Sequence, residues 1–376
     1  MAQTTQGAIT MAYGTVNTDI VADSSGGRLA PISSVFRNRI INGAMVIDQR
    51  NAGASVTASA STTYTLDRWC YSATQASKFT VQQNAGSVTA PVGFKNYLGA
   101  TSSSAYTVGA SEVFLIRQFI EGYNVSDLGW GTANAKTVTL SFQVYSSLTG
   151  TFGGSIQNAA ENRSYPFSYT ISSANTWTTA SVTIAGDTTG TWQTTTNTGM
   201  AINFSIGSGS SVSGTAGAWV AGGYTSVTGA TSVVGTNGAT FYITGVQLEV
   251  GSSATGFEYV NYQTSLTNCQ RYFFIVARDD AGPIGIANCT ATTGIRFPVP
   301  FPVNMRTDST VVYTAGQIRL NSSGANVNST ATPYLGYIST RMADVNLDGF
   351  TGLSAGQAGS IRLFSTTGYL AFNAEL

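Results

Sequence analysis

The chain has 376 residues, of which only 9% are charged, and its 17 basic and 17 acidic side chains give a formal net charge of zero. Typical globular proteins carry about 25% charged residues, so this balance argues against nucleic-acid binding by a basic face and against attraction to an anionic membrane surface. Histidine is absent, which removes the commonest general base, the histidine-activated nucleophiles and the usual zinc and copper ligands.

The three cysteines, Cys70, Cys269 and Cys289, are odd in number and far apart in apolar surroundings. This pattern indicates buried free thiols rather than a disulfide framework, and it fits assembly in a reducing cytoplasm. No apolar run approaches the ~18 residues of a membrane span. The first residues lack the basic and apolar regions of a secretory signal. If the protein acts outside a cell, we therefore expect it to be released by cell lysis as part of a particle.

Residues 1–34 are rich in Gly, Ser and Thr and show little periodicity. Such a composition cannot bury a core, so we expect an extended arm that orders only against a partner. The arm would attach the chain to a larger particle and would be dispensable for folding of the rest.

From residue 35 to 260 the sequence predicts a β-sandwich. Val138, Leu140, Phe142 and Val144 alternate with polar residues, which is typical of a half-buried strand. In "YPFSYTI", Pro166 lacks a backbone donor and so belongs at a sheet edge or at a strand start. Residues 112–122 are apolar on both faces, as in a covered strand. Many short strands joined by Gly, Ser and Asn turns indicate a sandwich or jelly roll.

Two features of this region suggest irregular structure. The strand pattern of residues 239–251 shifts phase at Gly245, which predicts a bulge. The tract from Ser208 to Gly238 is long for a loop in a compact domain, and such loops are usually functional or lie at interfaces.

Residues 261–272 predict a short helical linker with Thr264 or Ser265 as N-cap, and residues 273–376 predict a second β domain. The segment "FPVPFPV" and the strand that runs almost to the last residue would leave unpaired edges in a monomer. We therefore expect an all-β chain whose C-terminal domain forms a trimer.

Two acidic motifs have structural interpretations. Glu249 and Glu258 flank a turn after the last strand of the sandwich, where they would accept hydrogen bonds from turn amides or from an arginine such as Arg271. "DVNLDG" places Asp344, Asn346 and Asp348 in the order of a calcium loop, but Ala355 occupies the position of the required acid. A polar hairpin turn is the preferred interpretation, and cation binding stays open.

Several motifs together resemble a family of bacteriophage tail fibre proteins over about residues 36–273: "INGAMVIDQRNAG", "YTLDRW", "WGTANAKTVTLSF", "RSYPFSYTI", "NTWTTASVTI", "FYITGVQLEVGSSATGFEY" and "CQRYF". The middle part is similar to jelly-roll carbohydrate-binding modules. The C-terminal region, with "RFPVPFPVNMR", is similar to the distal, trimer-forming domain of related fibres. The chain departs from the family at Gly256, where relatives often have Pro, and at Gln143, where relatives often have Trp, so no binding site is carried over onto that strand.

Candidate ligand residues are aromatic residues in or next to glycine- and threonine-rich loops, where a ring can stack on a sugar. Trp177 lies in a strand-flanking motif and is assigned to structure. Trp130, between two glycines, either stacks on a sugar or closes the end of the sandwich. The complete candidate set is Trp192, Trp219, Tyr224 and Trp130.

The resemblance implies a homotrimeric virion protein that is made in the host cytoplasm and binds host surface glycans without turnover. No cofactor, catalytic residue, nucleic acid or membrane insertion is expected, and residues 1–34 would contact phage tail or capsid proteins. The alternatives are a purely structural virion component, such as a capsid fibre or tail collar, and a polysaccharide depolymerase. A depolymerase needs two carboxylates in a cleft and typically a repetitive β-helix, and the sequence shows no such repeats.

Overall fold

The computed structural model describes residues 20–22, 28–31, 36–278, 283–313, 318–322, 325–329, 331–364 and 368–376. It contains two compact units, Met1–Arg37 and Asn38–Leu376. In the first unit, strands β1 (Ile20–Ala22) and β2 (Arg28–Pro31) pair antiparallel. Most of the expected arm, residues 1–34, lies outside the described residues. No helix in the described ranges is long and apolar enough to cross a membrane.

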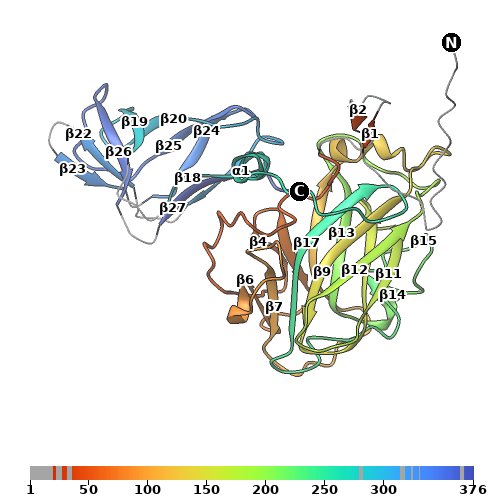
Figure 1. Ribbon diagram of the computed structural model, residues 1–376. Coiled ribbons are helices and arrows are strands. Elements are labelled where there is room, and N and C mark those ends of the chain that lie inside the picture. The colour runs from red at the N-terminus through yellow and green to blue at the C-terminus, as the bar shows by residue number, and fades with distance from the viewer. Residues whose placement is uncertain are drawn as a thin grey trace, which may run out of the picture. The chain divides into compact units, whose positions relative to one another are not determined.

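The second unit begins with two packed antiparallel sheets (Figure 1). The seven-stranded sheet has the order β15-β11-β10-β13-β8-β5-β4, and the six-stranded sheet has the order β12-β9-β17-β7-β6-β3. Their strands are β3 (Val56–Thr57), β4 (Thr62–Leu66), β5 (Trp69–Ala73), β6 (Phe79–Gln83), β7 (Leu98–Ser102), β8 (Val113–Glu121), β9 (Val138–Ser146), β10 (Gly150–Asn158), β11 (Arg163–Ile171), β12 (Thr178–Ile184), β13 (Thr198–Ser208), β15 (Val220–Ala221) and β17 (Thr240–Val250). This part of the chain is therefore an all-β jelly-roll sandwich, as predicted.

The inner faces of the two sheets form one aromatic-rich core. Phe142 of β9 packs edge-on against Phe204 of β13, with ring centroids 5.0 Å apart, and Phe152 of β10 lies 6.2 Å from Phe241 of β17. These side chains are buried. The alternation in residues 138–144 gives β9 because its apolar side chains enter this core while Ser141 and Gln143 point outward.

Two local predictions from the sequence concern an edge position for Pro166 and a bulge at Gly245. Pro166 lies in β11 at the sheet edge, where β15 covers only Arg163 and Ser164, so its missing donor breaks no ladder bond. Gly245 lies at a register shift between Thr244 and Gln247 in β17. Both predictions are confirmed.

Gly245→Ala is expected to destabilise the sandwich by about 2–3 kcal/mol. Gly245 has φ +61°, where an L-residue costs about 1–2 kcal/mol, and a Cβ there would lie 2.6 Å from Cζ of Phe94. Gly238→Ala is the matched control, because its φ of +74° has the same cost while no atom lies within 4 Å of the added Cβ. Urea unfolding of both variants measures the difference, and equal losses would show that Phe94 moves away freely.

The linker contains helix α1 (Tyr262–Gln270), whose N-cap is Asn261, so the prediction of Thr264 or Ser265 as N-cap is wrong. The Asn261 side chain accepts a hydrogen bond from the amide of Thr264 at 2.8 Å, and the helix therefore starts one turn earlier than the hydroxyl residues suggested.

The C-terminal region, residues 273–376, contains a three-stranded sheet of order β18-β27-β21 and a seven-stranded sheet of order β23-β22-β26-β19-β20-β25-β24. A second core of buried apolar residues contacts both sheets. The strands are β18 (Phe273–Arg278), β19 (Pro283–Cys289), β20 (Ile295–Pro300), β21 (Thr310–Tyr313), β22 (Ile318–Ser322), β23 (Ala325–Asn328), β24 (Tyr334–Ile338), β25 (Met342–Leu347), β26 (Ala358–Leu363) and β27 (Tyr369–Asn373).

The last strand does not need a second copy of the chain to pair. β27 lies between β18 and β21 and is hydrogen-bonded to both, so the expectation of an unpaired C-terminal edge is wrong. In β20, the ladder with β19 involves only Ile295 and Arg296, whereas the ladder with β25 continues to Pro300. Pro298 and Pro300 of "FPVPFPV" thus occupy the stretch of β20 that has a ladder partner on one side in the described residues, where a missing donor is tolerated, and Pro302 follows the end of the strand.

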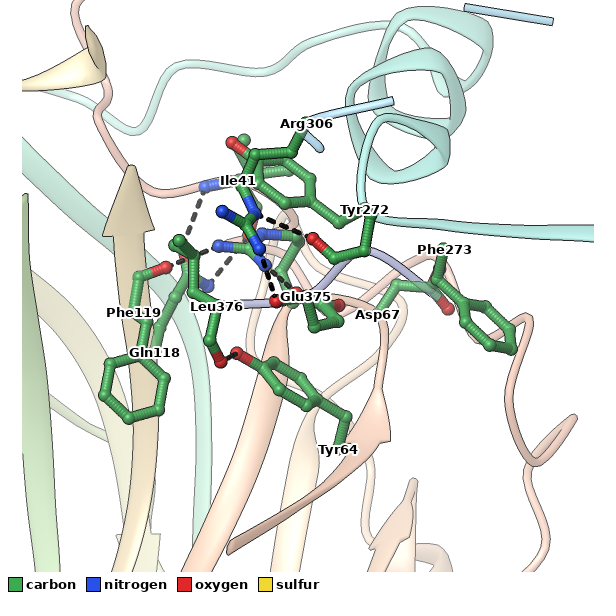
Figure 2. A network of polar contacts seen from close by, with 12 residues as sticks. Ile41, Tyr64, Asp67, Gln118, Phe119, Tyr272, Phe273, Arg306, Glu375 and Leu376 are labelled. Carbon is green, nitrogen blue, oxygen red and sulfur yellow. Dashed lines mark hydrogen bonds and ion pairs between the residues drawn. The ribbon is translucent and has the colours of Figure 1, made fainter. Parts of the chain in front are cut away.

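The sandwich and the C-terminal region meet at a polar junction inside the second unit (Figure 2). Glu375, near the end of the chain, pairs with Arg50 and Arg68 of the sandwich. In the opposite direction, Glu121 of β8 accepts two hydrogen bonds from the guanidinium of Arg271, at 2.5 and 2.9 Å, and one from the hydroxyl of Tyr272 at 2.6 Å. The C-terminal region therefore supplies a buried acid to cations of the sandwich, and the sandwich supplies one to the end of the linker.

The acids that flank the last strand of the sandwich hold its exit as predicted, although not through Arg271. Glu249 accepts hydrogen bonds from the amide and the hydroxyl of Thr255, at 2.8 and 2.7 Å. Glu258 accepts one from the amide of Asn38 at 2.8 Å, so it connects the strand exit to the start of the sandwich.

Candidate functional site

Three of the four candidate aromatic residues meet in one cluster, although they come from separate loops. Trp130 follows β8, Trp192 lies between β12 and β13, and Trp219 precedes β15. The ring centroids are 4.8 Å apart for Trp130 and Trp192, 5.2 Å for Trp130 and Trp219, and 5.4 Å for Trp192 and Trp219. All three pairs meet edge to face, which is a preferred geometry for aromatic rings. This set is called the tryptophan cluster below.

Burial divides the tryptophan cluster into a support and two partly open rings. Trp130 is 7% exposed and donates its indole N–H to the carbonyl of Lys136 at 2.8 Å. Trp192 and Trp219 are half-buried. The indole N–H of Trp219 donates to the carbonyl of Ala185 at 2.7 Å. Since these polar edges already have partners, the exposed parts of Trp192 and Trp219 can offer a ligand mainly apolar ring surface.

An ion pair fixes the edge of the cluster. The guanidinium of Arg163 donates twice to the buried carboxylate of Asp187, at 2.9 and 2.7 Å, and the indole of Trp192 donates to the same carboxylate at 3.2 Å. Burial alone would raise the pKa of Asp187, but the hydrogen bonds from Arg163 and the amide of Thr189 outweigh it and hold the pKa below its usual value. The carboxylate therefore stays ionised and keeps Trp192 in one orientation.

Tyr224, the fourth candidate, has no ring contact with the tryptophan cluster in the described part of the chain. Its ring instead packs on the backbone of Gly214 and Gly222, where an added Cβ would lie 3.1 Å from ring atoms. It belongs to the tract from Ser208 to Gly238, which packs against β10 and β11: the amide of Thr231 donates to the carbonyl of Thr151 at 2.7 Å. A role of Tyr224 in ligand binding stays a prediction.

A second aromatic group was not predicted. Trp177, Tyr145, Tyr242 and Tyr97 form a row on the outer face of the six-stranded sheet, with Tyr145 and Tyr242 stacked at 5.3 Å and Trp177 at 5.5 Å from both Tyr145 and Tyr97. Residues 84–97 cover the row. The indole N–H of Trp177 donates to the carbonyl of Thr89, and the hydroxyl of Tyr97 donates to the carbonyl of Ala85. Tyr145 and Tyr242 occupy the outward positions of β9 and β17, which is the signal that could have revealed them.

The acidic calcium-like motif is not a turn. Asp344 and Asn346 lie inside β25, and Asp344 pairs with Arg296 of the neighbouring strand, so the predicted hairpin turn is wrong. Burial of the alternating Ala343, Val345 and Leu347 favours a strand over a loop. Within the ranges described, no three His, Cys, Asp or Glu side chains group so as to hold a metal ion.

The three cysteines are free and buried, as predicted. Burial raises the pKa of the Cys70 thiol to about 12, so it stays protonated at neutral pH and behaves as a small apolar side chain.

Neither a protein-family model nor a curated protein matches the chain. Among solved structures, it is similar to the enzymatically active domain of tailspike protein 4 of bacteriophage CBA120, with TM-score 0.32 and 13% identity over 58% of this chain and 22% of that chain. It is also similar to a family 11 carbohydrate-binding module of Clostridium thermocellum, with TM-score 0.27 and 10% identity over 55% of this chain and 100% of that one. The xylan-binding domain of Xyn10C from Paenibacillus barcinonensis gives TM-score 0.27 and 10% identity, over 55% and 99%. At these TM-scores the alignments carry no argument about what this chain binds.

Proposed function

We propose that this chain is a subunit of a bacteriophage fibre that binds host-surface glycans without turnover, and that the tryptophan cluster is a sugar-contacting surface. The observation that carries the proposal is the convergence of Trp192 and Trp219 beside the Arg163–Asp187 ion pair, on loops that are otherwise rich in glycine and threonine. The motifs shared with tail fibre proteins support the virion setting.

The chemistry of the cluster suits a sugar. The apolar face of a pyranose ring stacks on indole, while its hydroxyls need donors and acceptors, which are plentiful in the threonine-rich sequence around Trp192. Because Trp130 and Asp187 already hold Trp192 in place, binding requires little ordering of side chains. A single site of this kind would bind at ~1 mM, about −4 kcal/mol. Several copies on one particle would raise the effective affinity by ~10²–10⁴.

The proposal includes a homotrimer that attaches to the particle through residues 1–34. Mass photometry of the purified chain is expected to give three copies, and a variant that begins at Val35 is expected to give the same mass. A stable monomer at micromolar concentration would contradict the trimer, and loss of assembly in the shortened variant would show that the arm belongs to the fold.

Replacing Trp192 and Trp219 together by alanine is expected to reduce adsorption of labelled protein to host cells at least tenfold, because both partly open rings are lost. Replacing both with phenylalanine keeps aromatic surfaces and should retain most of the adsorption. Tyr337→Ala, which removes a ring that is 73% exposed in the C-terminal region, is the control and should adsorb like the wild type. Melting curves check that the variants fold.

Adsorption is compared on cells with and without enzymatic removal of surface polysaccharide. Equal adsorption to stripped cells would indicate a protein receptor, and no adsorption at all would favour the purely structural alternative. Incubation of the protein with purified host polysaccharide is expected to release no new reducing ends. Their release would identify a depolymerase instead.

A further inference from the structure

A pocket of about 360 Å³ opens at the junction between the sandwich and the C-terminal region. It is small but within the range of ligand sites, which begin near 300 Å³. The sandwich contributes the turn after β10, the loop before β13 and the start of β13, and the C-terminal region contributes the segment before β21 and the end of the chain. The lining residues, together called the junction pocket, are Ala159, Gln193, Asn197, Thr198, Arg306 and Leu376.

Arg306 is a fixed cation in the junction pocket. Its guanidinium donates to the carbonyl of Ala374 at 2.7 Å, to that of Thr196 at 2.9 Å and to that of Glu375 at 2.8 Å. Figure 2 shows Arg306 beside Glu375, close to Leu376. A guanidinium has five N–H donors, so these three bonds leave donors for a ligand.

The hydrogen-bond partners of Arg306 are all neutral carbonyls, and the nearby charge of Glu121 acts on it only at longer range. Among the described residues no carboxylate forms an ion pair with it, whereas Arg50, Arg68 and Arg271 at the same junction all have acidic partners. Burial is the main cause that lowers the pKa of Arg306, which reflects the loss of water around its charge. A partly dehydrated cation that has no carboxylate within ion-pair distance among the described residues favours binding of an anion.

The other polar groups of the junction pocket are also available. The side chains of Gln193, Asn197 and Thr198 form no hydrogen bond with another residue that the structure describes. Two carboxamides and a hydroxyl beside a guanidinium match the hydroxyls and the acidic group of a sugar acid.

We propose that the junction pocket binds an acidic sugar, with Arg306 taking the anionic group and Gln193 and Asn197 taking ring hydroxyls. The inference goes beyond the proposed function, because it assigns a second sugar site outside the tryptophan cluster and names the class of sugar that this site takes. Since Thr196 belongs to the sandwich whereas Ala374 and Glu375 belong to the chain end, the arginine is oriented only when the junction is formed.

The test is titration of the full chain with galacturonic acid, galactose, galactose 6-phosphate and inorganic phosphate, followed by NMR or calorimetry. Galacturonic acid is expected to bind at least tenfold more tightly than galactose. Comparison with galactose 6-phosphate identifies whether a carboxylate or a phosphate is the preferred acidic group. Inorganic phosphate that binds as tightly as either acidic sugar would overturn the proposal, because the site would then be a simple anion site.

The variants separate ligand binding from folding. Arg306→Gln should abolish the preference for the acidic sugar, but it also loosens the chain end. Asn197→Ala and Gln193→Ala alter no junction bond and should each weaken binding about three- to tenfold. Unchanged binding in both would overturn the proposal. Arg319→Gln, at a partly buried arginine of β22 outside the junction pocket, is the matched control and should bind like the wild type.

The two proposals can fail separately. The Trp192 and Trp219 double alanine variant should lose adsorption while keeping its affinity for galacturonic acid. If the wild-type protein binds galacturonic acid but does not adsorb to cells at all, the junction pocket stands and the fibre function fails. If cells are bound but no acidic sugar is, the junction pocket is not the site.

Discussion

Replacing Glu375 with alanine is expected to lower the free energy of unfolding by about 3–5 kcal/mol, the usual cost of removing one partner of a buried ion pair. The Glu375 side chain is 3% exposed and neutralises Arg68, which is 1% exposed, and Arg50, which is 11% exposed. Without the carboxylate, two buried guanidinium groups lose the acid that forms ion pairs with them. Urea unfolding followed by tryptophan fluorescence measures the loss, because all five tryptophans lie in the sandwich.

The surroundings of Arg68 explain why water cannot easily replace Glu375. The guanidinium of Arg68 lies over the ring of Tyr272, 3.6 Å from its centroid, and donates to the carbonyl of Phe119 at 2.5 Å. Arg68 also has φ +69°, a left-handed conformation that costs a non-glycine residue about 1–2 kcal/mol. The surrounding contacts must hold this residue in place, and loss of the carboxylate removes one of them.

Two controls separate the buried pair from charge effects in general. Glu161→Ala removes an acid that also pairs with an arginine but is 50% exposed, and it should cost at most about 1 kcal/mol. The double replacement Arg68→Met with Glu375→Leu removes both members and should recover much of the stability lost in Glu375→Ala. A loss in Glu375→Ala as small as that in Glu161→Ala would contradict a dry junction.

The sandwich strands could be predicted because their signal is local. Alternation along residues 138–144, the proline at 166 and the glycine at 245 each describe their own position in a sheet, and each has the expected structure. The helix start shows the limit of such signals. Asn261, Thr264 and Ser265 are all acceptable N-caps, and only the packed structure selects Asn261.

The candidate site could be predicted only as separate residues. Trp130, Trp192 and Trp219 stand out as aromatics beside glycines, but their meeting depends on three loops that the sandwich brings together. Tyr224 has the same local signature and lies elsewhere. Arg306 carries no local signal at all, since its importance comes from carbonyls at Thr196, Ala374 and Glu375, which are distant in sequence. Long-range polar contacts of this kind leave no periodic pattern.

Asp67 is expected to make the protein more stable in mild acid than at neutral pH. Burial raises the pKa of Asp67 from 3.8 to about 6, against the opposing effect of Arg50 and hydrogen bonds from Gln49, while Asp48 adds a small increase. The folded state therefore binds a proton more tightly than the unfolded chain. The stabilisation from this proton is fully present below about pH 4 and is lost as the pH rises through about 6.

Asp67→Asn isolates this effect, because the amide keeps the size of the side chain but does not titrate. Asp67 accepts hydrogen bonds from the backbone and side-chain amides of Gln49, both at 2.6 Å, and the asparagine retains the first while the Gln49 side chain must rotate. The free energy of unfolding of Asp67→Asn minus that of the wild type should increase by about 2–3 kcal/mol between pH 4 and pH 8. Urea unfolding at each pH gives both values, and Glu161→Gln shows how much of the change comes from removing any carboxylate. A difference that does not vary with pH would mean that Asp67 stays ionised in the folded protein at pH 4, with Arg50 and Gln49 outweighing its burial.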